Sequence, residues 1–310
     1  MTRFASIGEC MVELVERSDG LLSRGFGGDT LNTALYLSRL GVATSYVTAL
    51  GDDSLSEAML AEWRAEGIET GEVLRIAGRL PGLYMIERDA RGERSFLYWR
   101  DRAPAREFFD RADDAALERL SGFDWLYLSG ISLSLYGEHG RARLRELLTA
   151  TRRNGGRVAF DGNYRSRGWA DAANARRAFG EILPLVDLAL PTLEDEQVLF
   201  SDADAAACIT RLRSEGIEEI VVKRGAQGCV ISVAGDCIEV PPLKVVQPVD
   251  TTAAGDSFNA GYIAARLRGA SPVDAARSGH SLAGAVIMAP GAVIPREAMP
   301  RDLVEMGAAS

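Results

Sequence analysis

The strongest constraint on the fold of this chain is a regular alternation of short apolar runs with longer amphipathic stretches. The apolar runs lie at residues 4–8, 123–128, 157–160, 187–190 and 220–222. Apolar residues at helical spacing mark the stretches 30–40, 54–66, 141–153 and 172–183. Strands and helices that alternate in this way predict an α/β fold, in which helices cover both faces of a mostly parallel sheet.

One segment departs from this alternation. Residues 83–88 and 93–100 are rich in β-branched and aromatic side chains and are joined by residues 89–92, so they predict a β-hairpin. Residues 11–16 are expected to add a strand to the same small sheet. Such a sheet is suited to be a lid over a cleft, and the alternative is an edge hairpin without a role in binding. The chain has no internal repeat or linker, so we expect one domain over residues 1–310, with lid segments at about 11–25 and 80–102.

Charge and composition exclude several classes of function. The net charge of −9 argues against an extended nucleic-acid surface, although a local pocket could still bind a small anion. No apolar run has membrane-spanning length, and the first residues lack the pattern of a signal peptide. Cys10, Cys208, Cys229 and Cys237 form no CxxC pair, which fits a reducing compartment. We therefore expect a cytoplasmic protein without nucleic-acid or membrane partners.

Lysine is scarce in this sequence. Only Lys223 and Lys244 occur, and neither follows a glycine. A Walker-type phosphate loop requires a Gly-Lys pair, so that loop is excluded. If a nucleotide binds, another arrangement must hold its phosphates.

The segment 250–261, with the sequence DTTAAGDSFNAG, provides such an arrangement. Its small residues Ala253, Ala254 and Gly255 let a ligand approach the backbone closely and lead directly into an amphipathic helix. Free amides at a helix start attract an anion, and Asp256 in the first turn could accept a proton from an attacking hydroxyl. The alternative from these residues alone is a capped helix after a tight loop.

Two other motifs accompany this one. Gly27 and Gly28 precede the helical stretch 30–40, where Asp29 and Asn32 could select hydroxyl donors and acceptors. The sequence KRGAQG at residues 223–228 follows an apolar run and predicts a strand that ends in a glycine turn. Each of these motifs alone is weak evidence of function.

Together, the three motifs resemble those of the ribokinase-like carbohydrate kinases, and the resemblance covers essentially the whole chain. It implies a ribokinase-like three-layer α/β/α catalytic domain with ATP and Mg²⁺ as cofactors. By this resemblance Asp256 is the catalytic base, and the amides of Ala254, Gly255 and Asp256 form an anion hole. Gly28, Asp29 and Asn32 would then contact the sugar. The residues that the resemblance places at the nucleotide are Asn163, Lys223, Gly225, Gly228, Ala253 and Gly255.

Further segments are similar to kinases of 2-keto-3-deoxygluconate, namely residues 7–14, 79–84, 98–100, 127–132, 161–165 and 294–300. This resemblance implies transfer of the ATP γ-phosphoryl group to the 6-hydroxyl of that sugar acid. Arginine suits the substrate carboxylate, with Arg165 favoured over Arg100, while Tyr84 and Tyr98 offer hydroxyls from the lid. The alternatives are a fructokinase, a kinase of an isomeric deoxy-keto acid, and a non-catalytic sugar-binding regulator.

The metal motif departs from the family pattern. Where many ribokinase-like enzymes have Asn-x-x-Glu, this chain has Thr192 and Asp195, so we expect Mg²⁺ to be held through water and phosphate, by Asp195 or Glu196. Potassium or another monovalent cation near Asp250 and Thr252 is left open. Open strand edges in the lid lead us to expect a homo-oligomer formed through it.

Overall fold

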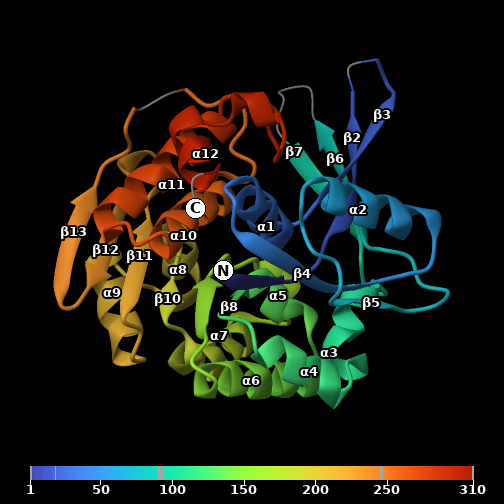
Figure 1. Ribbon diagram of the computed structural model, residues 1–310, viewed down its shortest axis with the longest axis horizontal. Helices are drawn as coiled ribbons and strands as arrows, with labels where there is room; N and C mark the ends of the chain where they lie inside the picture. Colours follow the sequence, from blue (N-terminus) through green and yellow to red (C-terminus); the bar gives the residue numbers. More distant parts are fainter. Residues whose placement is uncertain (1, 18, 89–93, 245–246, 309–310) are drawn as a thin grey trace.

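A nine-stranded sheet lies at the centre of the protein (Figure 1). The computed structural model describes residues 2–17, 19–88, 94–244 and 247–308. Neighbouring strands in this sheet are parallel, except that β12 runs antiparallel to both β11 and β13. In spatial order the strands are β13 (Asp236–Val240), β12 (Cys229–Val233), β11 (Glu219–Lys223), β10 (Leu188–Ala189), β9 (Arg157–Asp161), β8 (Trp125–Ser129), β1 (Arg3–Ile7), β4 (Ala43–Leu50) and β5 (Val73–Arg75).

Helices cover the two faces of this sheet and bury a separate hydrophobic cluster on each face. Successive strand residues alternate between the clusters: Leu126 and Leu128 lie in one, and Tyr127 between them lies in the other. The first face carries α3 (Phe108–Arg111), α4 (Asp114–Ser121), α5 (Gly130–Leu135), α6 (Glu138–Arg153), α7 (Ala172–Ile182), α8 (Leu193–Phe200) and α9 (Ala205–Ser214). The second carries α1 (Asp29–Arg39), α2 (Ser54–Ala65), α10 (Ala254–Leu267), α11 (Pro272–Val286) and α12 (Arg301–Ala308).

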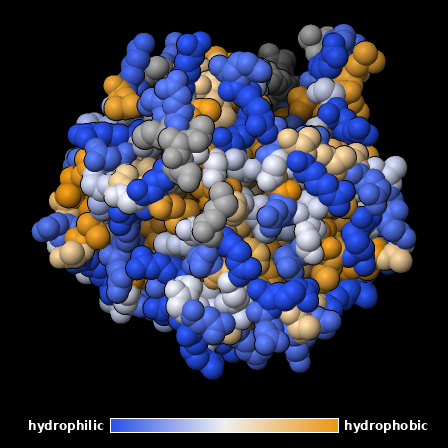
Figure 2. All heavy atoms as spheres, viewed as in Figure 1, coloured by the Kyte–Doolittle hydropathy of each residue, from blue (hydrophilic) through white to orange (hydrophobic). Residues whose placement is uncertain are grey.

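A second, four-stranded sheet projects from the main body at the upper right of Figure 1. Its order is β3 (Leu22–Gly27), β2 (Met11–Glu16), β6 (Leu83–Arg88) and β7 (Arg94–Trp99). Only the central pair, β2 and β6, is parallel. Hydrophobic side chains stand among hydrophilic ones at this corner of the surface (Figure 2), where Leu21 and Leu22 are exposed.

The structure confirms the predicted fold class. The helical stretches 30–40, 54–66 and 172–183 correspond to α1, α2 and α7 within one residue at each end, and the two arms of the hairpin are β6 and β7. The connecting residues 89–92 lie outside the described part of the chain. Features that were not predicted include β3, whose side chains are mostly polar or glycine, the strands β4 and β5 of the main sheet, and the antiparallel edge formed by β12 and β13.

The helices α10 and α11 approach each other closely beside the carboxyl ends of the central strands. A side chain at Gly261 of α10 would place its Cβ 2.8 Å from the carbonyl oxygen of Ser278 and 2.9 Å from the Cα of Gly279. Glycine is therefore required at this helix crossing. Because α10 begins with the Asp256 motif, the contact fixes the position of that motif against α11.

This contact gives a first prediction. Gly261→Ala should destabilise the protein by about 1–3 kcal/mol, the usual cost of an overpacked core, and should lower the urea midpoint. The control is Gly180→Ala in α7, where an added Cβ would meet nothing within 4 Å and helix propensity favours alanine by about 1 kcal/mol. Equal stability of the two variants would show that the α10–α11 contact does not depend on glycine.

Candidate active site

The start of α10 presents open backbone amides beside a carboxylate. Ala253, the residue before the helix, has left-handed backbone angles (φ 58°) and caps the helix with no side-chain hydrogen bond. The Ala254 amide donates to the carbonyl of Thr251 at 3.2 Å, and the Ser257 amide donates to the carbonyl of Ala253 at 2.9 Å. Within the described residues the amides of Gly255 and Asp256 have no such acceptor, so they are available to an anion.

Asp256 is a buried carboxylate held by one strong donor. The side-chain amide of Asn32 in α1 donates to its Oδ2 at 2.8 Å. Burial raises the pKa of Asp256, and the nearby Asp29 carboxylate raises it further, while the Asn32 hydrogen bond opposes both effects. A carboxylate with a raised pKa is a stronger base, which suits proton abstraction from a hydroxyl.

Asp29, in the first turn of α1, lies close to Asp256 and Asp161, and we call these three carboxylates the acidic basin. Oδ2 of Asp29 accepts a hydrogen bond of 2.7 Å from the side-chain amide of Asn163. The backbone of Asn163 has a positive φ of 29°, which turns the chain sharply after β9 and brings this amide to Asp29. The family resemblance predicts Asn163 at the nucleotide. Its side chain instead donates to Asp29, which the same resemblance predicts at the sugar.

The glycine pair before α1 is required by close approaches within the protein. A Cβ on Gly27 would lie 2.3 Å from the hydroxyl of Tyr84, and one on Gly28 would lie 2.2 Å from the carbonyl oxygen of Glu9. Gly27 ends β3, so its close approach to Tyr84 lies within the small sheet, whereas Gly28 lets the chain before α1 pass close to the segment that follows β1. The sequence motif was located correctly, but this reason for it was not foreseen.

A second buried network connects the acidic basin with β11. The ammonium group of Lys223 donates to Oδ2 of Asp161 at 3.0 Å and to Oδ1 of Asn259 at 3.1 Å. The amide of Asn259 in turn donates to Asp161 at 2.6 Å and to the hydroxyl of Tyr127 at 3.1 Å. Sequence reasoning did not single out Asp161, Asn259 or Tyr127. The available signal was the polar residue Asp161 at the end of the apolar run 157–160.

Two buried oxygen atoms in these networks have no hydrogen-bond partner within the described part of the chain. They are Oδ1 of Asn32 and Oδ1 of Asp161. Buried polar atoms are almost always hydrogen-bonded, so each of these oxygens is suited to a polar ligand or a hydrated cation.

A hollow of about 380 Å³ opens beside Lys223 and the start of α10. Its volume suits a small ligand or cofactor. Predicted nucleotide residues form part of its wall, namely Lys223, Gly225, Gly228 and Gly255. The other lining residues are Thr192, Ala226, Pro242, Lys244, Pro248, Thr251, Ala254, Phe258, His280, Ala283, Gly284 and Ile287. Asn163 and Ala253 are not among them.

The small sheet faces the loops that precede α10. A hollow of about 240 Å³ separates Glu13, Val15 and Ile86 of this sheet from Asp250 and Gly291 of the main body. Tyr84 lies on the same face as Glu13, directly across from it on the neighbouring strand, and donates a hydrogen bond to its carboxylate. The small sheet therefore faces the loops at Asp250 and Gly291 across this hollow.

Arg100 and Tyr98 lie at the base of this sheet. Arg100 forms an ion pair with the buried carboxylate of Glu9, and its guanidinium carbon is 6.0 Å from the centroid of the Tyr98 ring. Tyr98 pairs across the strands with Tyr84, and the two ring centroids are 6.0 Å apart. These three predicted substrate residues thus form one cluster.

Arg165 follows β9 and points to α8. Its Nη1 lies 3.0 Å from each carboxylate oxygen of Asp195 and also donates to the carbonyl of Tyr164. The side chain is 57% exposed. Asp195 lies in the first turn of α8. Thr192, the residue just before this helix, lines the hollow beside Lys223. The Arg165–Asp195 pair therefore links the loop after β9 to the first turn of α8.

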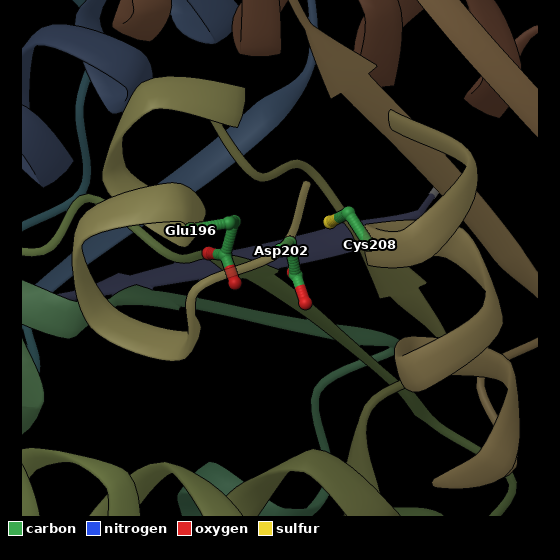
Figure 3. Close-up of side chains that lie close together, drawn as sticks. All are labelled: Glu196, Asp202 and Cys208. Carbon is green, nitrogen blue, oxygen red and sulfur yellow. The ribbon is translucent and has the colours of Figure 1, made fainter. Parts of the chain in front are cut away.

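Glu196, the other proposed metal residue, points into a separate buried cluster (Figure 3). Its carboxylate lies near the carboxylate of Asp202 and the thiol of Cys208, and the three groups are close enough together to hold a metal ion. The guanidinium of Arg211 already bonds both carboxylates, to Glu196 at 2.6 Å and to Asp202 at 2.7 Å. A cation at this position would repel Arg211, so the cluster is a buried ion-pair network. Asp195 is also paired, with Arg165, but that arginine is largely exposed and Asp195 lies one turn from Thr192 in the wall of the hollow, so Asp195 stays the candidate for the metal.

Asp250 ties two loops together near the start of α10. Its Oδ1 accepts from the amide of Thr252 at 3.0 Å and from the Thr252 hydroxyl at 2.7 Å. Its Oδ2 accepts from the amide of Gly291 at 2.8 Å. The carboxylate thus holds the 250–252 loop against residue 291.

A buried base, open helix amides and a glycine-lined hollow together define an enzyme that transfers a phosphoryl group to a hydroxyl. The model of the pfkB family carbohydrate kinases matches residues 1–299, and this chain belongs to that family. It is 48% identical over 304 residues to the 2-dehydro-3-deoxygluconokinase of Dickeya dadantii, covering 96% of this chain and 98% of the relative. It is 47% identical over 306 residues to that of Escherichia coli K12, with coverages of 96% and 99%.

More distant relatives share the fold. The chain is 30% identical over 260 residues to a fructokinase of Klebsiella pneumoniae, with coverages of 83% and 82%. A Xylella fastidiosa fructokinase solved with bound ATP superposes with a TM-score of 0.85 at 22% identity, covering 99% of this chain and 98% of that one. Among the described residues, no helix is both long and apolar enough to span a membrane.

The environment of Asp256 predicts a characteristic pH dependence. Since its pKa is raised, acidification should protonate the base at a higher pH than the value of about 4 usual for aspartate, and kcat/KM should fall accordingly. Asn32→Ala removes the donor that stabilises the carboxylate, so the acidic midpoint of the kcat/KM profile should move to still higher pH. Asn174→Ala, on the outer helix α7, serves as the control. An unchanged midpoint in Asn32→Ala would contradict this assignment.

Proposed function

We propose that this chain transfers the γ-phosphoryl group of ATP to the 6-hydroxyl of 2-keto-3-deoxygluconate, the substrate also called 2-dehydro-3-deoxygluconate. The observation that carries the proposal is the buried Asp256 carboxylate beside the open amides of Gly255 and Asp256. The high identity to two 2-dehydro-3-deoxygluconokinases over nearly the whole chain supports the choice of sugar acid.

Each step of the reaction has a residue suited to it. Asp256 accepts the proton of the attacking hydroxyl, and the amides of Gly255 and Asp256, placed by the turn at Ala253, stabilise charge on the transferred phosphoryl group. The Ala254 amide, expected in the same anion hole, already donates to the carbonyl of Thr251. The backbone at Gly225 and Gly228, together with Lys223, holds the nucleotide phosphates. When bound with the nucleotide, Mg²⁺ supplies further charge neutralisation. Asp195 is the residue suited to hold it through water.

The sugar acid needs partners for both its hydroxyls and its carboxylate. Gly28, Asp29 and Asn32 serve the hydroxyls, and Asn163 contributes by orienting Asp29. Arg165 serves as carboxylate anchor: its Asp195 contacts use only Nη1, which leaves the Nε–Nη2 edge for a bidentate pair. Arg100, already paired with Glu9, is the second candidate, and Tyr84 and Tyr98 approach from the lid.

Two other functions compete with this one. A fructokinase is favoured by the 30% identity to such an enzyme, but a neutral sugar needs no arginine at the far end of its pocket. A non-catalytic sugar-binding regulator would keep the fold, yet it would gain nothing from a buried base whose pKa is raised. A kinase of an isomeric deoxy-keto acid would share every residue named above.

Several wider properties belong to the same proposal. The small sheet acts as a lid on a single catalytic domain, and its outer strands β3 and β7 form a homo-oligomer with a second copy. Buried free thiols at Cys10, Cys208 and Cys229 fit a reducing cytoplasm. Potassium near Asp250 and Thr252 would stabilise the loop before α10, and its test is the dependence of kcat on added potassium chloride.

The carboxylate anchor tests the choice of substrate. In a coupled ADP-release assay, Arg165→Ala should raise KM for 2-keto-3-deoxygluconate by about 10- to 150-fold, since it removes a charge-assisted hydrogen bond. Fructose, if it is turned over, should be much less affected, so the ratio of kcat/KM for acid over neutral sugar should fall. Arg167→Ala, an exposed neighbour, is the matched control.

Two results would count against this proposal. An unchanged ratio in Arg165→Ala would remove Arg165 as the anchor and make Arg100→Ala the next variant. A wild-type enzyme that prefers fructose would overturn the sugar-acid assignment and favour a fructokinase.

A further inference from the structure

A hollow of about 420 Å³ lies at β5, the edge strand of the main sheet. It shares no lining residue with the hollow beside Lys223. Its lining residues are Leu74, Arg75, Ile76, Ala77, Arg79 and Arg111. Half of them are arginines and none is acidic, although the chain as a whole carries a net charge of −9. The wall of this hollow is therefore a local concentration of positive charge.

Two carboxylates that do not line the hollow hold its three arginines in place. Nη2 of Arg75 donates to Glu57 at 2.6 Å. Glu107 accepts from Arg79 through one oxygen and from Nε of Arg111 through the other, the latter at 2.7 Å. The hydrogen bonds from Arg111 and Arg79 lower the pKa of Glu107, so this carboxylate stays ionised. Two paired carboxylates thus face three guanidinium groups, which leaves one positive charge in excess.

The same arginines keep N–H groups free for a ligand. A guanidinium carries five N–H donors. Within the described residues, Arg79 donates only through Nη2 and Arg111 only through Nε, while Arg75 uses Nε and Nη2. The side chains of Arg79 and Arg111 are 26% and 51% exposed, so a dissolved ligand can reach them. The hollow therefore offers charged donors that ion pairs have already oriented.

The wall is built from the two connections between the main body and the β6–β7 hairpin. Arg75 ends β5, and Arg79 lies in the segment that leads from β5 to β6. Arg111 ends α3, which follows β7. Glu107 joins the two connections, because it pairs with both Arg79 and Arg111. A ligand in the hollow would contact both connections as well.

We propose that this hollow binds a small phosphate monoester at a site separate from that of phosphoryl transfer. Guanidinium groups match the geometry of phosphate and bind it through paired N–H donors. A phosphate monoester has three terminal oxygens that accept from several arginines at once, whereas one bidentate arginine already satisfies a carboxylate. The apolar side chains of Leu74, Ile76 and Ala77 suit the carbon part of the ester.

A titration of the full chain followed by ³¹P NMR tests this site, with glycerol 3-phosphate as the probe. In about 0.15 M sodium chloride, where exposed charges are screened beyond about 8 Å, wild type should bind the probe with a Kd of about 1 mM or lower. Arg111→Gln should weaken binding about 10- to 150-fold, because it removes a charge-assisted hydrogen bond. Arg75→Gln changes another part of the wall and should also weaken binding, so the test does not depend on one variant.

Arg119→Gln is the matched control. Arg119 lies on α4, is 57% exposed and pairs with Glu72, and it does not line the hollow. This variant makes the same change in net charge as Arg111→Gln and should bind the probe as wild type does.

Three results would overturn the inference. Wild type that shows no saturable binding below about 10 mM would not have a phosphate site here. Equal weakening in Arg119→Gln and Arg111→Gln would show general attraction by charge. Unchanged binding in both Arg111→Gln and Arg75→Gln would place the probe elsewhere on the protein. None of these results bears on the proposed phosphoryl transfer, which ADP release measures separately.

Discussion

The rest of the site depends on the confinement of three carboxylates, Asp29, Asp161 and Asp256, to one basin. Each comes from a different element, namely the start of α1, the end of β9 and the start of α10, so only the folded sheet brings them together. Like charges in a buried place repel and resist ionisation unless each has a donor. Here the donors are distinct: Asn163 for Asp29, Lys223 and Asn259 for Asp161, and Asn32 for Asp256. Asp29 and Asp256 each accept from one side-chain amide, and Asp256 differs from Asp29 because it lies beside the open amides at the start of α10, which makes it the proposed base.

The sequence predicted the strands and helices that carry these carboxylates better than the hydrogen bonds between them. The apolar runs and helical periodicity located β1, β8, β9 and β11 because burial on both faces leaves a direct record in residue type. The small residues before Asp256 predicted a tight turn into a helix, and α10 begins at Ala254, while the role of this helix start as an anion site stays a prediction. The Lys223–Asp161–Asn259 network was missed because its members are 36 to 98 residues apart in sequence, and no local pattern records such a contact. The strand β3 was missed for a different reason, since its polar and glycine-rich residues carry no strand signal.

Both arginines proposed for the substrate carboxylate form ion pairs within the protein. Arg165 contacts Asp195, and Arg100 contacts Glu9. Pairing keeps these cations oriented within a protein of net charge −9, and an exposed pair such as Arg165–Asp195 is worth only about 0–1 kcal/mol. The proposed role of Arg165 as carboxylate anchor therefore needs only a weak ion pair to be replaced. The buried network of Arg211 differs, because neither Glu196 nor Asp202 is open to solvent, and its role is to hold α8 and α9 together.

The central claim is that Asp256 is a base whose burial costs stability in exchange for reactivity, and Asp256→Asn tests both parts at once. Because the pKa of Asp256 is raised in the folded protein, folding stability falls as pH rises from the unfolded value of about 4 towards the folded value. Asparagine has no such loss, so at neutral pH the variant should melt at a Tm no lower than wild type while kcat falls by about 10²- to 10⁴-fold. A variant that keeps more than about a third of wild-type kcat, with chemistry rate-limiting, would contradict the account. So would a variant that loses activity only because its Tm is lowered.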